Sequence, residues 1–162
     1  MKYSFQKYYP PFMQHLKRHL PESRTVGSQF TSPDLITARQ VVDFAYEKIK
    51  YRYRGERMVL TVDCGRVIGL DAVIALEDIP LGTTVRKETR IKREQGSSRK
   101  PSYTVLVAYG LRRRHTTKMV IVAEPIAGAR NLHTFSSIYP GNYAPDFDDA
   151  EFWNTHAFIR EK

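Results

Sequence analysis

The spacing of apolar residues predicts one clear helix in the first third of the chain. Between residues 35 and 49, apolar side chains recur three or four positions apart, as they do along one face of an α-helix. Ser32 is a favourable N-cap, Pro33 fits the first helical position, and Asp34 suits the positive end of the helix dipole. We therefore expect a core-facing helix over residues 32–51. Its apolar stripe consists of Leu35, Ala38, Val42, Ala45 and Ile49.

A shorter helix is predicted from Phe12 to Leu20, where Pro21 ends it. It carries His15 and His19 at positions i and i+4, a spacing that is also found between metal ligands. No carboxylate or cysteine accompanies the two histidines. We therefore interpret them as part of a solvated basic face.

After Gly55 the pattern changes to that of β-strands. Short runs of apolar and β-branched residues alternate with polar ones and are separated by turn residues. The first two runs flank the turn Asp63-Cys64-Gly65 and indicate a hairpin or a bulged pair. The expected strands are 58–62, 67–76, 83–92, 102–109, 118–123 and 131–139.

A final short helix is expected between residues 148 and 157, with Asp148 as its N-cap and Phe152 and Trp153 as its anchors on the sheet. The order of elements predicts an α+β fold, with N-terminal helices packed on a mostly antiparallel sheet of about five strands. The chain has 162 residues, of which 41% are apolar, which is enough for one hydrophobic core. We expect a single domain.

Composition excludes several classes of protein. Cys64 is the only cysteine, so neither a disulfide framework nor a CxxC zinc site is expected, and we expect no metal and no cofactor. No run approaches the roughly 20 apolar residues of a membrane span. The N-terminus lacks the apolar segment of a signal peptide. We expect a cytoplasmic protein with no membrane partner, or one that is delivered by a route independent of a signal peptide.

The charge of the chain gives the first indication of function. There are 26 Lys and Arg residues against 17 Asp and Glu, a net charge of +9 and a pI of about 9.7. A polyanionic partner is favoured, because each phosphate that a basic side chain neutralises releases condensed counterions. The alternative is a cationic protein without such a partner.

Two basic runs concentrate this charge. On a strand, Arg86, Arg90 and Lys92 would share one face, because side chains alternate with period two, and Arg93 would follow at the strand end. The second run begins at Arg112 on an expected hairpin loop, where phosphate contacts are easily made. The alternative for each run is a solvated loop or an edge strand whose charges discourage aggregation.

The segment from residue 133 to 141 combines an imidazole, hydroxyls and a phenol on one predicted strand. Strict alternation would place His133, Ser137 and Tyr139 on one face, with Thr134 on the other. That face offers a general acid or base beside hydroxyl donors, and Tyr139 could stack on a base or donate to a phosphate oxygen. The alternative is a half-buried strand whose polar side chains satisfy one another.

His156 follows the aromatic pair of the final helix. It would act in catalysis only if the helix returned it beside His133. A lone histidine beside aromatic residues is otherwise a satisfied core group.

Several motifs follow in order between Val85 and Phe158. A cationic strand is followed by two apolar strands and then by a hydroxyl-bearing strand that ends in Tyr-Pro-Gly. After this strand come Ala-Pro, a group of acidic residues and the motif Trp-x-x-His-Ala. In this order the chain resembles the barnase, EndoU, colicin and RelE-like (BECR-type) group of bacterial ribonucleases. The resemblance implies N-terminal helices packed on an antiparallel sheet.

The resemblance also implies metal-independent cleavage of RNA by attack of a ribose 2′-hydroxyl on the adjacent phosphate. This chemistry needs a proton acceptor, a proton donor and cations. Arg90 and Arg93 match the positions that bind the phosphate. Ser137 matches the strand hydroxyl, with Thr134 as the alternative. Tyr139 matches the Tyr-Pro-Gly motif, and His156 matches the Trp-x-x-His-Ala motif. His133 has no counterpart, so its role rests on chemistry alone. We predict Arg90, His133, Ser137 and His156 as catalytic residues, and Arg86, Lys92, Arg93, Arg112, Thr134 and Tyr139 as RNA-binding residues.

Two other functions stay open at this point. The first is a non-catalytic module that binds nucleic acid or an acidic protein. The second is NAD-dependent ADP-ribosyl transfer, for which the nearest acidic candidates, Glu124 and Glu151, fit poorly. A toxin-like ribonuclease would also have an acidic immunity or antitoxin protein as a partner, because such a protein complements its basic surface. The sequence leaves the oligomeric state open.

Overall fold

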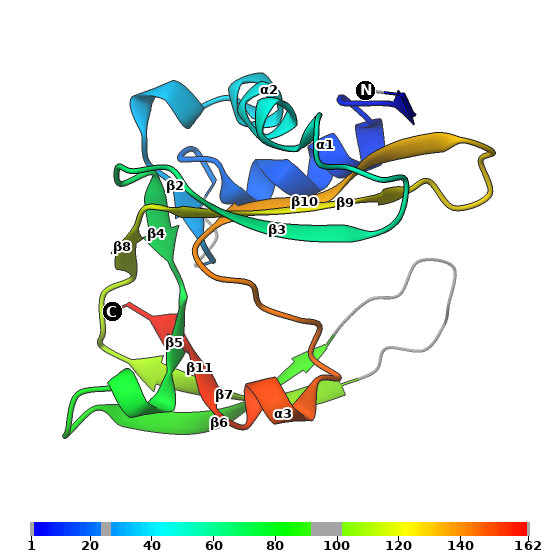
Figure 1. Cartoon of the computed structure of the whole chain (residues 1–162). Helices are drawn as coiled ribbons and strands as arrows, with labels where there is room; N and C mark the ends of the chain where they lie inside the picture. The colour runs from blue at the N-terminus through cyan, green and yellow to red at the C-terminus, as the bar shows by residue number, and fades with distance from the viewer. Residues whose placement is uncertain (1, 24–26, 92–101, 162) are drawn as a thin grey trace. The chain divides into compact units, whose positions relative to one another are not determined.

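The computed structural model describes residues 2–23, 27–91 and 102–161. In this part of the chain there are three α-helices and three sheets of three or four strands, most of them antiparallel (Figure 1). The α+β class is therefore confirmed. The strands divide among three sheets, whereas the sequence predicted one sheet of about five strands. None of the described helices is both long and apolar enough to cross a membrane.

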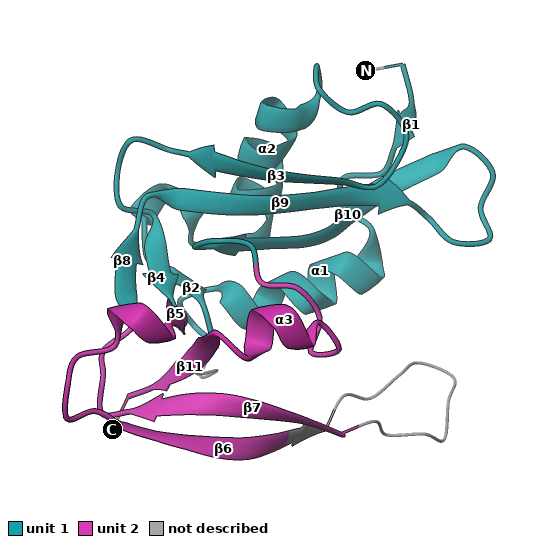
Figure 2. Cartoon of the chain, turned by 60° about the horizontal axis from the view of Figure 1, so that its bottom comes forward, with its two compact units in different colours: residues 1–71, 114–143 teal, residues 72–113, 144–162 magenta. Residues whose placement is uncertain are grey.

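The chain forms two compact units, each built from separate stretches of sequence (Figure 2). Unit 1 comprises residues 1–71 and 114–143, and unit 2 comprises residues 72–113 and 144–162. The sequence pattern predicts one domain and one strand over residues 67–76. In the structure that run is two short strands, β4 (Gly69–Asp71) in unit 1 and β5 (Val73–Ala75) in unit 2.

The main sheet of unit 1 has the strand order β1-β10-β9-β3. Its strands are β1 (Ser4–Phe5), β10 (Leu132–Pro140), β9 (Lys118–Pro125) and β3 (Met58–Asp63). β1 runs parallel to β10, and the other pairs are antiparallel. Half-buried and exposed residues alternate along β3, as expected for a strand with one covered face. A second, smaller sheet joins β2 (Gln29–Phe30), β4 and β8 (Arg114–Thr116).

Two helices complete the core of unit 1. They are α1 (Pro10–Leu16), which continues as the 3₁₀ turn η1 (Lys17–His19), and α2 (Ala38–Ile49). Phe135 of β10 is fully buried, and its ring lies 4.9 Å from that of Phe5 and 5.7 Å from that of Phe12. Burial of one such ring contributes about 1.5–3 kcal/mol. These aromatic contacts join the N-terminal segment and α1 to the last strand of the sheet.

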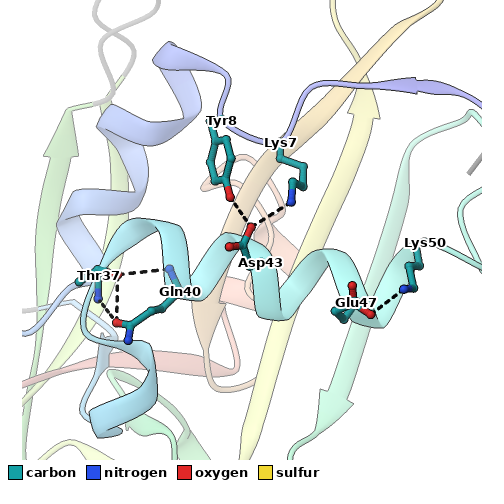
Figure 3. A network of polar contacts seen from close by, with 7 residues as sticks. All are labelled: Lys7, Tyr8, Thr37, Gln40, Asp43, Glu47 and Lys50. Carbon is teal, nitrogen blue, oxygen red and sulfur yellow. Dashed lines mark hydrogen bonds and ion pairs between the residues drawn. The ribbon is translucent and has the colours of Figure 1, made fainter.

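Helix α2 begins later than predicted. Residues 33–35 form a separate 3₁₀ turn, η2 (Pro33–Leu35), and the N-cap of α2 is Thr37. The Thr37 hydroxyl accepts from the backbone N–H of Gln40, and the Gln40 side chain accepts from the backbone N–H of Thr37 (Figure 3). This capping box satisfies two backbone donors at once, so it outcompetes Ser32 as the helix start. Ser32 is instead buried, and its hydroxyl accepts from the guanidinium group of Arg66 at 2.9 Å.

Polar contacts on the outer side of α2 attach the N-terminal segment to the helix (Figure 3). The Asp43 carboxylate accepts from the Tyr8 hydroxyl and from the Lys7 ammonium group, the latter at 3.0 Å. These two hydrogen bonds, Tyr8 first, hold the pKa of Asp43 below its ordinary value. One turn further on, Glu47 pairs with Lys50 at 2.7 Å.

Strand β10 contains a bulge. Its pairing with β9 shifts between Phe135 and Ser137, so that Ser136 is the extra residue. In a regular strand without a bulge, Phe135 and Ile138 would lie on opposite faces, because they are three positions apart. With it, both are buried in the core that α1 and α2 cover.

Unit 2 contains one sheet with the order β5-β11-β7-β6. Its longer strands are β6 (Thr84–Ile91), β7 (Ser102–Tyr109) and β11 (His156–Arg160). β11 is parallel to β7 and antiparallel to β5. A short 3₁₀ turn, η3 (Leu76–Asp78), follows β5. Ile74, Ala108, Ala157 and Ile159 form the small buried cluster on one face.

The predicted helix between residues 148 and 157 is wrong in its second half. Helix α3 spans only Ala150–Trp153, and the chain then enters β11. The buried side chains of Ala157 and Ile159 alternate with half-buried ones, which is the period of a strand. Pairing with two neighbouring strands decides the conformation here, because it satisfies the backbone groups that a helix would otherwise satisfy within itself.

Gly69 provides a test of the small sheet of unit 1. A Cβ atom at this position would lie 2.5 Å from the backbone oxygen of Gln29 and 2.8 Å from the Cβ of Pro140. We expect Gly69→Ala to lower the free energy of unfolding by about 1–3 kcal/mol, because a backbone oxygen cannot move aside. Gly27→Ala is the matched control, since nothing lies within 4 Å of its Cβ position. Urea unfolding measures both variants, and equal midpoints for them would contradict the packing described for β4.

Candidate nucleic-acid interface

One face of the unit 2 sheet brings basic and aromatic side chains together. Arg86 of β6 and Phe158 of β11 both lie opposite Val107 of β7, from its two sides. Residues that are directly opposite in neighbouring strands share a face of the sheet. We call this surface the β6–β7–β11 face. Its side chains include Arg86, Glu88, Tyr109, His156, Phe158 and Arg160.

Two guanidinium groups lie over one aromatic ring on this face. Arg86 and Arg160 are 5.8 and 5.6 Å from the ring centroid of Tyr109. This distance permits a cation–π attraction, which is worth about 0.5–1 kcal/mol at an exposed site. Arg86 itself is exposed. The arrangement holds two planar hydrogen-bond donors beside an aromatic ring.

An ion pair crosses the same face. Arg160 donates to the Glu88 carboxylate at 2.9 Å. Glu88 therefore neutralises part of the charge that the sequence assigned to this strand. Neither Glu88 nor Arg160 is among the site residues predicted from the sequence, although period-two alternation already places Glu88 on the face of Arg86. Arg160 had no comparable signal, because it was expected to follow a helix.

Arg90, Lys92, Arg93 and Arg112 are the other predicted cations. Arg90 lies in β6 with its backbone opposite Tyr103 of β7. Lys92 and Arg93 fall outside the described residues. Arg112 is exposed in the segment that follows β7. The pKa of Glu161 lies below its ordinary value, mainly because the backbone N–H of Arg113 donates to this carboxylate. The positive charge of Arg112 lowers this pKa further, by a smaller amount.

An aromatic cluster supports β11. The Trp153 ring stacks on Phe158 at 4.7 Å, and Phe147 lies 5.5 Å from Trp153. Trp153 is 4% exposed, and its indole N–H donates to the carbonyls of Pro145 and Asp146. These contacts hold α3 against β11.

His156 occupies a structural position at the end of α3. Its ring stacks on Phe152 with centroids 3.8 Å apart and an angle of 5° between the planes. Its Nδ1 atom lies 3.0 Å from both the Phe152 carbonyl and the Thr155 hydroxyl. The imidazole thus satisfies a carbonyl at the C-terminal end of the helix, as basic side chains often do.

His133 is also held by packing. It is 6% exposed, and its Nδ1 atom lies 2.8 Å from the hydroxyl of Tyr53. The rings of Tyr3 and Tyr53 each lie 5.4 Å from the imidazole. Burial raises the pKa of Tyr53, so this phenol stays protonated at neutral pH. Both histidines predicted as catalytic therefore have firm structural partners.

The bulge in β10 changes which side chains share a face. Thr134, Ser137 and Tyr139 pair with Glu124, Val122 and Val120, which lie on one face of β9. His133 lies on the other face with Phe135. The predicted grouping of His133 with Ser137 and Tyr139 is therefore wrong, because the extra residue reverses the alternation after Phe135. The Thr134 hydroxyl donates to the carbonyl of Gln6 at 2.8 Å.

Tyr139 instead lies beside His19 of η1, which in turn lies beside His15 of α1. Its ring centroid is 5.8 Å from that of His19, which is 5.7 Å from that of His15. Burial lowers the pKa of His15 and, more strongly, lowers the pKa of His19 to about 4. All three side chains are half-buried. The interpretation of the histidines as a solvated basic face is therefore wrong.

The predicted site residues divide between the units. His133, Thr134, Ser137 and Tyr139 belong to unit 1, and Arg86, Arg90, Arg112 and His156 belong to unit 2. The pairing of the cationic strand with the hydroxyl-bearing strand therefore stays a prediction.

Among the residues that the structure describes, no group of three or more His, Cys, Asp or Glu side chains could hold a metal ion. Cys64 is half-buried, and this burial raises the pKa of its thiol. Comparisons with protein-family models, with curated proteins and with solved structures found no match.

The lowered pKa of His19 has a consequence for stability. Its ordinary value is 6.5 and its folded value is about 4, so the unfolded chain binds a proton before the folded chain does. The free energy of unfolding should therefore fall as the pH drops from 6.5 to 4, by about 2–3 kcal/mol from this group. His19→Asn should remove that part of the pH dependence. Urea unfolding across this range measures it, with His115→Asn on exposed β8 as the control. A His19→Asn slope equal to that of the unmodified protein would contradict the assignment.

Proposed function

We propose that the protein binds RNA and cleaves it as a metal-independent endoribonuclease. The observation that carries this proposal is the placement of Arg86 and Arg160 over the ring of Tyr109 on the β6–β7–β11 face. A guanidinium group binds a phosphate through two parallel hydrogen bonds, and an aromatic ring offers a surface for base stacking.

Charge and sequence resemblance support the same substrate. A net charge of +9 favours a polyanion, and counterion release makes such binding stronger at low salt. The resemblance of the segment Val85–Phe158 to the BECR-type ribonucleases favours RNA over DNA, because 2′-hydroxyl attack requires a ribose. On this proposal the natural antagonist is an acidic immunity or antitoxin protein.

Incubation of the purified protein with total RNA in EDTA tests the activity. We expect fragments that end in a 2′,3′-cyclic phosphate and begin with a 5′-hydroxyl, because the ribose supplies the nucleophile. A DNA strand of the same sequence should stay intact. Intact RNA at near-stoichiometric protein would contradict the proposed activity.

Neighbouring residues of β6 offer a matched pair for the binding surface. Arg86 and Lys87 are both exposed cations, but they lie on opposite faces of the strand. We expect Arg86→Gln to weaken binding of a single-stranded RNA several-fold and to lower the slope of log affinity against log salt by about one. Lys87→Gln should have a much smaller effect. Fluorescence anisotropy at several salt concentrations measures both, and equal losses would show that only total charge matters.

Glu88 gives a prediction of the opposite sign. Its carboxylate pairs with Arg160 on the β6–β7–β11 face and opposes an approaching phosphate. Glu88→Gln should therefore strengthen RNA binding, by about two-fold to ten-fold at low salt. The same anisotropy assay measures the change. Unchanged or weaker binding would indicate that RNA does not contact this face.

A non-catalytic binding module is the second candidate. His133 and His156, the two histidines that the sequence singled out for proton transfer, are both engaged in packing and hydrogen bonds. This candidate predicts salt-sensitive binding of RNA without any fragments in the EDTA incubation.

A further inference from the structure

The contact between His19 and Tyr139 joins parts of unit 1 that are far apart in sequence. His19 ends the turn η1, and Tyr139 lies near the end of β10. Their ring centroids are 5.8 Å apart with an angle of 34° between the planes. Both side chains are half-buried, so each combines a packed ring with contact to solvent.

A hydrogen bond fixes the tautomer of His19. Its Nδ1 atom lies 2.8 Å from the backbone oxygen of Ser28, which can only accept. In the neutral ring Nδ1 therefore carries the proton, and Nε2 carries the lone pair. The ring is thus oriented as a proton acceptor through Nε2.

The segment that supplies this carbonyl is itself held in place. The side-chain amide of Gln29 donates to the backbone oxygens of Leu20 and Pro21, at 3.1 and 2.9 Å. These hydrogen bonds tie the residue after Ser28 to the residues after His19. The acceptor of the His19 proton is therefore positioned by local structure.

His19 is also kept neutral. Burial lowers its pKa to about 4, the Ser28 carbonyl opposes that shift, and His15 and Arg18 add to it in the same direction as burial. At neutral pH the imidazole is a free base. The nearby phenol of Tyr139 is a hydroxyl donor, and Lys17, in the same turn, is exposed and cationic.

We propose that His19 and Tyr139 form the proton-transfer centre of the RNA cleavage reaction, with His19 as the general base and Tyr139 as the general acid. This inference rests on the proposed function and assigns its chemistry to unit 1.

The reaction balances with these two groups. Nε2 of His19 takes the proton of a ribose 2′-hydroxyl, and the O2′–P bond forms. The P–O5′ bond breaks, and the leaving oxygen takes the phenolic proton of Tyr139. The products are a 2′,3′-cyclic phosphate and a 5′-hydroxyl. The proton on His19 then returns to the Tyr139 phenolate through water, which restores both groups.

The test uses the full chain and an RNA–DNA chimera with one ribonucleotide, cut under EDTA. His19→Asn retains an amide donor for the Ser28 carbonyl but has no base, and Tyr139→Phe keeps the ring but has no acidic proton. We expect each to lower kcat at least about 100-fold, the usual contribution of general acid–base catalysis, with RNA binding within two-fold of the unmodified protein. His115→Asn and Tyr143→Phe, at an exposed histidine and an exposed tyrosine, should leave kcat unchanged.

Each outcome separates the two proposals. Cleavage by the unmodified protein that survives in His19→Asn and Tyr139→Phe would overturn the proton-transfer centre and leave the ribonuclease function standing. Absence of cleavage by the unmodified protein would overturn the ribonuclease function, and the centre with it. If His19→Asn loses its urea unfolding transition, His19→Gln takes its place in the test. Activity retained by His19→Gln would overturn the centre, because glutamine has no imidazole base, and a loss of kcat with the unfolding transition kept would support it.

Discussion

The pairing of β10 with β9 is the constraint on which the rest of unit 1 depends. Phe135 and Ile138 must both be buried, yet they are three residues apart on a strand whose side chains alternate. One extra residue in β10 resolves the conflict. The same residue determines that Ser137 and Tyr139 share a face with Thr134 and not with His133, and so it decides which polar groups of this strand can act together.

In unit 2 the corresponding constraint is the repulsion between cationic side chains on one strand face. A strand face that carries several cations is unfavourable unless something compensates for their repulsion. Glu88 does so from within β6, and the ring of Tyr109 does so from β7. Arg160 reaches both groups from the far end of the chain because β11 pairs in parallel with β7. The β6–β7–β11 face is therefore a mixed polar and aromatic surface, and Glu88 would weaken the attraction of this face for any polyanion.

Burial and hydrogen-bond partners, more than residue type, decide whether a histidine of this chain could transfer a proton. His133 and His156 have the side chain that proton transfer requires, but Tyr53 and the end of α3 engage them. His15 and His19 have no sequence motif around them, yet burial keeps both neutral, and a carbonyl orients His19. A reactive histidine needs a fixed tautomer, and the Ser28 carbonyl supplies one for His19.

The sequence by itself determined the α+β class, the core stripe of α2, the positions of most strands and the basic character of the chain, because these follow from local periodicity and composition. It also contained two further signals. Phe135 and Ile138 are three positions apart, so strict alternation would separate two apolar residues, and alternation places Glu88 on the face of Arg86. Tertiary structure alone decided that residues 67–76 divide between two units, that residues 156–160 form a strand, and that Tyr139 contacts His19. Each of these depends on pairing or packing between segments distant in sequence, and no local pattern encodes which partner will satisfy a given backbone group or cover a given side chain.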